Sequence, residues 1–133
     1  VLNAPHGQIG AAVTMGAMLR NRQFNTRIAP GSECLTSCVL VFAAGRERVL
    51  GVHPSLARIG ISRVPGDAEI STPRCEPEIG RAQALTLTRY LRAMLPPPTA
   101  EAVFHVMAQA DCKANLFWRP ADVVNNGLVT TVR

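Results

Sequence analysis

The sequence has no long apolar segment and few charged or aromatic residues. Its longest apolar run is Val39–Ala44, far below the roughly 18 residues that a membrane-spanning helix needs. Only 17% of the residues are charged and 47% are hydrophobic, a balance that excludes an intrinsically disordered chain. With 133 residues the chain can bury a core of its own, and we expect one domain over residues 1–133.

Positive charge is present but is not concentrated anywhere. The net charge is +5, and the basic residues are spread from Arg20 to Arg133 without forming a block. Nucleic-acid binding requires a clustered basic face, and four Phe, one Trp and one Tyr offer few rings on which bases could stack. We therefore expect a solvated basic surface and no nucleic-acid partner.

The four cysteines include no C-x-x-C pair. Cys34 and Cys38 are four positions apart, whereas Cys75 and Cys112 each stand alone. Structural zinc sites are built from closely paired ligands, so we expect no metal and no cofactor. An even number of cysteines in a small basic domain is compatible with disulfide bonds and an oxidising compartment.

The spacing of apolar residues predicts helices and strands in alternation. The expected helices are Gln8–Arg22, Leu35–Ala44, Glu78–Leu95, a helix capped by Thr99 that reaches Ala110, and Pro120–Gly127. The expected strands are Val1–Asn3, Asn25–Ala29, Arg48–Val52, Leu56–Arg63 and Leu128–Val132. This order favours an α/β domain with a mostly parallel sheet flanked by helices.

Two consequences of this pattern concern the core and the start of the chain. The segment Leu35–Ala44 is apolar on every side, so Val39, Val41 and Phe42 should be buried. The chain starts at Val1, inside a predicted strand. Either residues were removed upstream, or the segment lies inside a larger protein.

Two segments carry residues suited to chemistry. Leu2–Gln8 combines a strand end, a tight turn and a helix start, which can direct backbone N–H groups toward an anion; an ordinary turn fits the same residues. Gly31–Cys38 places hydroxyls and thiols where a buried helix begins, and the helix dipole there favours the anion of a nucleophile. A helix-capping cluster of small residues fits that segment equally well.

Three segments together resemble a known family. Leu2–Gly7 (LNAPHG) is similar to the family's L-N-S-P-G-G, Cys34–Gly45 (CLTSCVLVFAAG) to a C-A-S-A-C motif with its apolar helix, and Pro120–Val129 to a closing helix, Gly-Leu and strand. The chain thus resembles the proteolytic subunit of Clp protease and its bacterial extracytoplasmic relatives, within the crotonase-like fold. The resemblance implies a spiral of βα units from which the family's first strands are missing.

The resemblance also assigns roles around the second segment. The family's serine nucleophile falls on Thr36, and the N–H of Ser37 falls on one oxyanion donor. The other donor falls on His6, followed by Gly7. Ser37 is an alternative nucleophile if the start of the helix is shifted by one residue.

The remaining catalytic positions depart from the family. Its catalytic histidine falls on Ser62, and its acid falls loosely near Asn115. A serine hydroxyl is no general base at neutral pH, and a hydroxyl nucleophile is weak without an adjacent base. These departures imply a non-catalytic or very weak serine-peptidase relative that binds a peptide or a small carbonyl or carboxylate ligand.

Two alternatives remain open at this point. One is an active hydrolase in which His6 serves as the base for Thr36 or Ser37. The other is an oligomeric interaction domain without a ligand, because family members form rings or trimers. The resemblance and the even cysteine count further imply an extracytoplasmic, periplasmic location.

Two disulfide pairs are candidates in such a compartment. Cys75 precedes a predicted pair of helices and Cys112 follows it, so a chain reversal at the prolines between them would bring the two loops to one side. Cys34 and Cys38 are the rival or companion pair. One helical turn places their Cα atoms about 6 Å apart, within the disulfide range.

Overall fold

The computed structural model of the chain describes Leu2 and residues 9–51, 57–61, 81–109 and 116–133. Within these ranges the helices are α1 (Ile9–Asn21), α2 (Ser37–Ala43), α3 (Arg81–Met94), α4 (Pro97–Gln109) and α5 (Pro120–Asn125). The strands are β1 (Thr26–Ile28), β2 (Glu33–Leu35), β3 (Arg48–Leu50), β4 (Arg58–Ile61), β5 (Leu116–Trp118) and β6 (Thr131–Val132).

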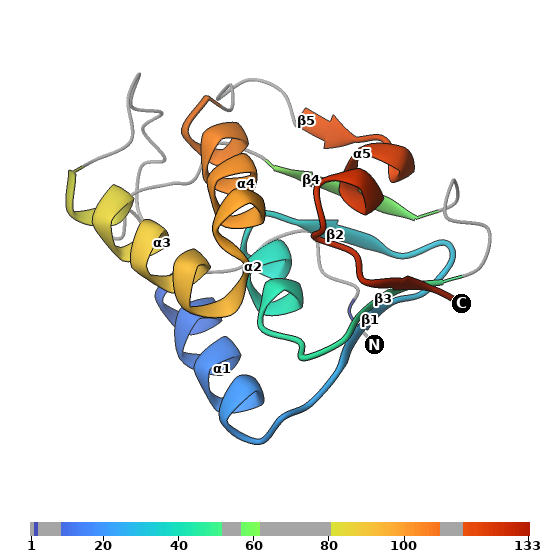
Figure 1. Cartoon of the computed structure of the whole chain (residues 1–133), viewed down its shortest axis with the longest axis horizontal. Helices are drawn as coiled ribbons and strands as arrows, with labels where there is room; N and C mark the ends of the chain where they lie inside the picture. Colours follow the sequence, from blue (N-terminus) through green and yellow to red (C-terminus); the bar gives the residue numbers. More distant parts are fainter. Residues whose placement is uncertain (1, 3–8, 52–56, 62–80, 110–115) are drawn as a thin grey trace, which may run out of the picture.

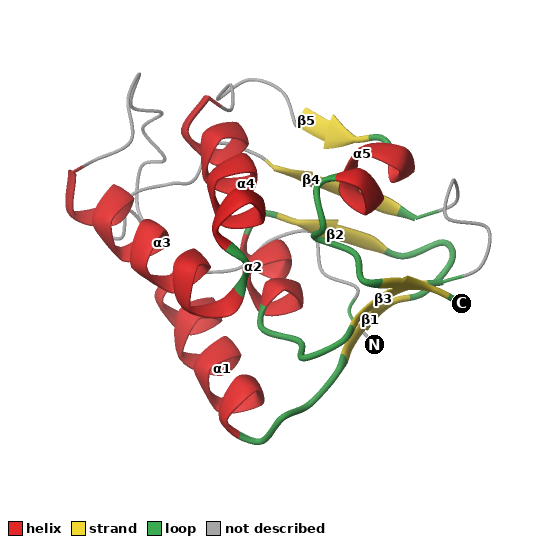
Figure 2. Ribbon diagram, in the orientation of Figure 1, coloured by secondary structure: helices red, strands yellow, loops and turns green. Residues whose placement is uncertain are grey.

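The described strands form two three-stranded sheets. In the first, β3 lies between β1 and β6 and is parallel to both; in the second, β4 lies between β2 and β5, parallel to β2 and antiparallel to β5. Figures 1 and 2 show α1, α3 and α4 gathered on one side of the molecule and the strands on the other, with α2 between them. The expected α/β class with mostly parallel pairing is confirmed.

Several expected boundaries were wrong. The helix expected from Leu35 begins only at Ser37, because Glu33–Leu35 pairs with Arg58–Gly60 as strand β2. Strand β5 was not expected at all, and it exists as the antiparallel neighbour of β4. Its pairing with β4 is non-local, so the local pattern of the sequence did not reveal it.

Thr99 is not the cap that the sequence predicted. Helix α4 begins two residues earlier, at Pro97, so Thr99 lies in its first turn. Its hydroxyl donates instead to the carbonyl of Asn126, at 2.7 Å. Proline suits the first helical turn because its missing N–H would have no partner there, and this allows α4 to start inside the proline run that ends α3.

Helix α2 is the centre of the core. All seven of its residues are buried, including Val39 and Phe42 at 0% exposure and Val41 at 7%, which confirms the expected burial. It contacts α1, α3, β1, β2 and β4. Because α2 is surrounded on every side, its terminal carbonyl groups need partners from the protein itself.

The hydroxyls of Tyr90 and Thr26 supply two of these partners. The amide of Ala44 bonds to Val41 O at 3.1 Å, which tightens the last turn, and Leu40 O accepts a bond from the Tyr90 hydroxyl at 2.6 Å. In the same turn, Thr26 Oγ1 donates to Phe42 O at 2.7 Å. The phenol of α3 and the hydroxyl of β1 thereby fix α2 against both elements.

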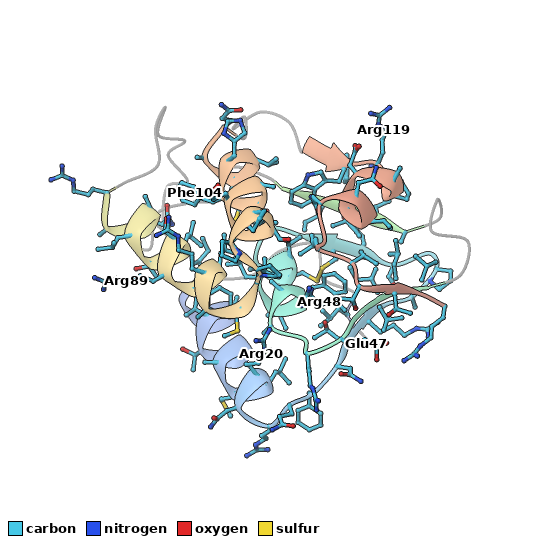
Figure 3. All side chains as sticks on the ribbon, viewed as in Figure 1. Arg20, Glu47, Arg48, Arg89, Phe104 and Arg119 are labelled. Atoms are coloured by element: carbon cyan, nitrogen blue, oxygen red, sulfur yellow. A yellow bond between two sulfur atoms is a disulfide. The ribbon has the colours of Figure 1, made fainter. Side chains whose placement is uncertain are left out.

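Arg20, in the last turn of α1, supplies a third partner (Figure 3). Its Nε donates to Ala44 O at 2.9 Å, and its Nη2 donates to Met94 O at 2.6 Å. These carbonyls lie at the ends of α2 and α3, where the helix dipoles place partial negative charge. One guanidinium group therefore joins the C-terminal ends of two helices.

Arg48 of β3 acts on the segment just after α2 and is itself buried. Its guanidinium donates to Gly45 O at 3.1 Å, to Leu128 O at 2.7 Å and to Gly127 O at 3.1 Å. Burial, together with the positive charge of Arg20, lowers the pKa of Arg48 from its ordinary value. The charge is satisfied by main-chain carbonyls after α2 and after α5, so Arg48 joins these two segments.

Truncation of Phe42 tests the central place of α2. We expect Phe42→Ala to reduce the free energy of unfolding by about 3–5 kcal/mol, because the side chain is fully enclosed and its removal leaves a cavity. The matched control is Phe24→Ala, since Phe24 is 50% exposed and should cost less than about 1 kcal/mol. Urea denaturation measures both, and equal small losses would contradict the assignment.

The titration of Tyr90 tests whether its hydroxyl is buried against α2. Burial raises the pKa of Tyr90 to about 12, although the charge of Arg20 acts in the opposite direction. Because the folded pKa exceeds the unfolded value of about 10, this contribution to stability is complete below pH of about 10 and is lost as the pH rises through about 12. Tyr90 is the single tyrosine, so phenolate absorbance follows it directly.

The control for this titration is Tyr90→Phe, which should lack the loss of stability in that pH window. A phenolate midpoint near 10 in the folded protein would contradict the buried hydrogen bond to Leu40.

Candidate functional site

A single residue connects strand β2 to helix α2. The strand ends at Leu35 and the helix begins at Ser37, so Thr36 alone makes the turn from strand to helix. It does so with φ 49° and ψ −98°, in the region that side chains rarely adopt. A β-branched residue there is a genuine outlier, and such strain gathers at functional sites.

Hydrogen bonds on both sides hold the main chain of Thr36. Its N–H donates to Gly60 O of β4 at 2.9 Å, and its own carbonyl accepts from Leu40 N at 3.2 Å. Thr36 and Ser37 are 5% and 4% exposed, so both hydroxyl-bearing residues lie beneath the surface. The turn is thus buried and is held between a strand and a helix.

The contribution of Gly60 was missed from the sequence. Its carbonyl accepts the Thr36 N–H, and it pairs with Leu35 inside β4. A glycine inside a strand often marks a close backbone approach, which is the signal that could have drawn attention to it.

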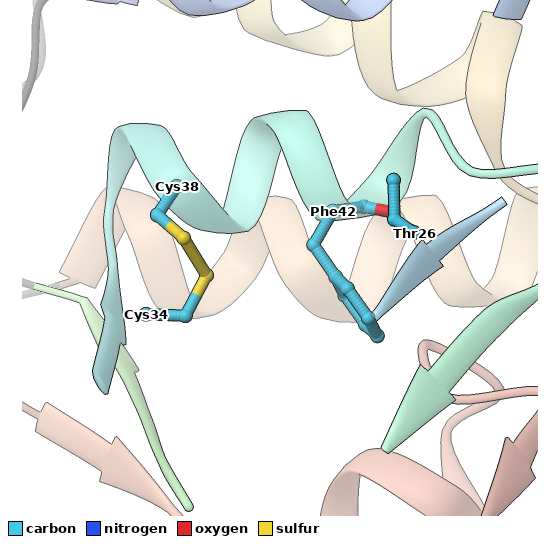
Figure 4. The surroundings of a disulfide bond; sticks show 4 residues. All are labelled: Thr26, Cys34, Cys38 and Phe42. Atoms are coloured by element: carbon cyan, nitrogen blue, oxygen red, sulfur yellow. A yellow bond between two sulfur atoms is a disulfide. The ribbon is translucent and has the colours of Figure 1, made fainter. Parts of the chain in front are cut away.

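The turn is bridged by a disulfide (Figure 4). Cys34 of β2 and Cys38 of α2 are bonded, with their Cα atoms 5.2 Å apart. Cys34 is 0% and Cys38 is 5% exposed, so the bond lies in the core. One of the two candidate pairs is therefore present, and Cys75 and Cys112 lie outside the described residues.

The other predicted site residues also lie outside the described part of the chain. These are His6, Gly7, Ser62 and Asn115. The structure thus places Thr36 and Ser37 side by side in the turn, and the roles of the other four positions stay predictions.

Two other kinds of feature are absent from the described residues. No three His, Cys, Asp or Glu side chains in these ranges lie together as metal ligands would. None of the described helices combines the length and the apolar character that crossing a membrane requires.

A cavity lies away from the turn, between α3 and α4. It has a volume of about 170 Å³ and is lined by Thr88, Arg92, Ala100, Glu101 and Phe104; Figure 3 labels Phe104. Neither Thr36 nor Ser37 lines it, so it is separate from the candidate site.

Comparison with known proteins places the fold. No protein-family model matches the chain, and no curated protein matches it either. Among solved structures, a mutant of the 1510-N membrane-bound stomatin-specific protease in complex with a substrate peptide gives a TM-score of 0.65 at 12% identity, over 99% of this chain and 58% of that chain. An asparagine-to-aspartate mutant of ClpP1 from Listeria monocytogenes gives 0.63 at 12% identity, over 99% and 70%.

A third neighbour belongs to another enzyme class. An enoyl-CoA hydratase/isomerase from Cupriavidus metallidurans CH34 gives a TM-score of 0.50 at 12% identity, over 94% of this chain and 38% of that chain. The chain therefore has the fold that Clp-type proteases share with crotonase-like enzymes, as expected, and it spans 58% of the length of the stomatin-specific protease.

The cysteine pairing can be tested chemically. Because Cys34 and Cys38 are bonded, unreduced and denatured protein should show no more than two free thiols among its four cysteines. Cleavage after Leu35 should leave two peptides that separate only on reduction. A count of four free thiols would contradict the bond, and the fully reduced protein is the control for the count.

Proposed function

We propose that this chain is a peptidase-fold protein of the Clp protease type with a degenerate catalytic site. It binds an extended peptide, or a small ligand with a carbonyl or carboxylate group, beside Thr36, and it turns over little or none of it. The observation that carries this proposal is the main chain of Thr36, which alone connects β2 to α2 at φ 49°. Hydrolases of other folds hold a serine nucleophile on a sharp, strained strand-to-helix turn of this kind.

The chemistry of the turn supports binding over catalysis. A hydroxyl attacks a carbonyl only if a base takes its proton, and the position that the resemblance gives to that base holds Ser62. Loss of a triad member typically lowers kcat by about 10⁴-fold or more.

Backbone donors can survive the loss of the base. The N–H groups of Ser37 and His6 are the proposed pair that faces a carbonyl or carboxylate oxygen. A backbone donor does not depend on its side chain, so Ser and His can serve where other residues stand in active relatives. The proposed ligand is thus recognised by the same groups that would stabilise an oxyanion.

An active hydrolase is the second candidate, and the strained turn favours it. In that case His6 would be the base for Thr36 or Ser37.

Two further proposals concern the domain and the compartment. We propose that residues 1–133 form one domain and that the protein works in an oxidising, extracytoplasmic compartment. The buried Cys34–Cys38 bond supports the second of these, since such bonds persist mainly in oxidising compartments.

A fluorophosphonate probe separates the two functional candidates. We expect no labelling of the wild-type protein, because no base activates Thr36. We expect labelling of a triple variant carrying His6→Gly, Thr36→Ser and Ser62→His, in which the family's nucleophile, donor and base are restored. Mass spectrometry of the labelled peptide identifies the residue.

The control is the same triple background with Thr36→Ala, which should not label. Labelling of the wild type at Thr36 or Ser37 would overturn the degenerate site and make His6 the candidate base. If wild type and triple variant are both silent, turnover of peptide esters and binding of peptide carboxylates decide between a binding site and none.

A further inference from the structure

The disulfide and the strained residue occupy the same turn. Cys34 lies two residues before Thr36, and Cys38 lies two residues after it. We propose that the Cys34–Cys38 bond is a positioning element: it holds the main chain of Thr36 in its left-handed conformation and so fixes the direction of the Ser37 N–H. The inference rests on the proposed function only in that it concerns the same turn.

Both flanking elements are anchored independently of the turn. Cys34 and Leu35 pair with Ile59 and Gly60 of β4, and α2 is buried along its whole length. One residue must then bridge these two elements, so the strain at Thr36 follows from the positions of its neighbours, and the bond between Cys34 and Cys38 fixes those positions relative to each other.

Main-chain hydrogen bonds also act at the turn. The Thr36 N–H donates to Gly60 O, and Leu40 N donates to the Thr36 carbonyl. The net contribution of one such bond to stability is small and is of the same order as the cost of a non-glycine residue in a strained conformation. A covalent link between the residues on either side of Thr36 adds a constraint that a single hydrogen bond does not supply.

The length of the disulfide loop points to a local role. A disulfide stabilises mainly by restricting the unfolded chain, and this effect grows with loop length. Here the sequence separation is only four residues, so the general effect is near its minimum. A bond of this span instead fixes the distance between the end of β2 and the first turn of α2.

Amide hydrogen exchange at residue 36, followed by NMR, tests this inference. We compare the wild type with a Cys34→Ala, Cys38→Ala variant. Loss of the bond should lower the protection of the Thr36 amide by about tenfold or more, because the turn relaxes and the amide leaves Gly60 O. The amide of Gly51, which donates to Ile28 O in the other sheet at 2.8 Å, is the internal reference and should keep its protection.

A glycine at position 36 provides the rescue. Glycine adopts positive φ without strain, so Thr36→Gly should keep the residue-36 amide protected whether or not the disulfide is present. The matched control is Gln23→Gly, because Gln23 is the other described non-glycine residue with positive φ, at 59°, and lies outside this turn. It should not restore protection at residue 36.

Each outcome decides the proposal. Protection at Thr36 that survives loss of the bond overturns it, and so does protection that is lost equally with threonine and with glycine. An equal loss of amide protection at Gly51 would mean that the disulfide stabilises the whole fold, and this also overturns the proposal. If the cysteine-free protein fails to fold, recovery of folding by Thr36→Gly supports the proposal, and continued failure overturns it.

These measurements read the main chain and need no ligand or turnover. A silent fluorophosphonate probe therefore leaves them unaffected, and a failed rescue leaves the proposed function standing.

Discussion

The hydrogen bonds at the C-terminal end of α2 are the interaction on which the rest of the fold depends. A helix buried along its whole length leaves its last carbonyl oxygens without water, so the protein must supply donors. The donors come from four different elements: Arg20 of α1, Thr26 of β1, Arg48 of β3 and Tyr90 of α3. Because each bond needs its element at a fixed place, satisfying one helix end positions both helices and two strands of the first sheet around it.

The N-terminal end of α2 is secured by different means. There the chain enters from β2 through Thr36, whose side chain makes no capping hydrogen bond and whose main chain is strained. This end is held instead by the pairing of β2 with β4 and by the disulfide. Since the C-terminal end is already fixed by four donors, α2 cannot shift along its axis to relieve the strain. The fixed opposite end of the helix and the Cys34–Cys38 bond therefore act together on the main chain of Thr36.

The sequence predicted the parts of the fold that have a long enough pattern. The apolar segment around Val39 and Phe42 indicated a buried helix, and Pro120 indicated the start of α5; both are present. Strands β2 and β5 were missed although β1 and β3, which are equally short, were expected; the pairing with β4 that creates β2 and β5 is non-local. In the site, residue types and family resemblance indicated Thr36 and Ser37, but no local pattern indicates a positive φ on a threonine or the carbonyl of Gly60 that holds it.

Threonine at this turn is unfavourable both for the main chain and for nucleophilic chemistry. Its second substituent on Cβ disfavours positive φ and stiffens the side chain, so it makes the turn harder to hold and the hydroxyl harder to use. A glycine would relieve the strain, and a serine would be the better nucleophile. A turn held in place around such a residue by a covalent bond retains fixed backbone donors, and fixed donors are what recognition of a carbonyl oxygen requires. Position without reactivity is the combination expected of a peptidase fold used for binding.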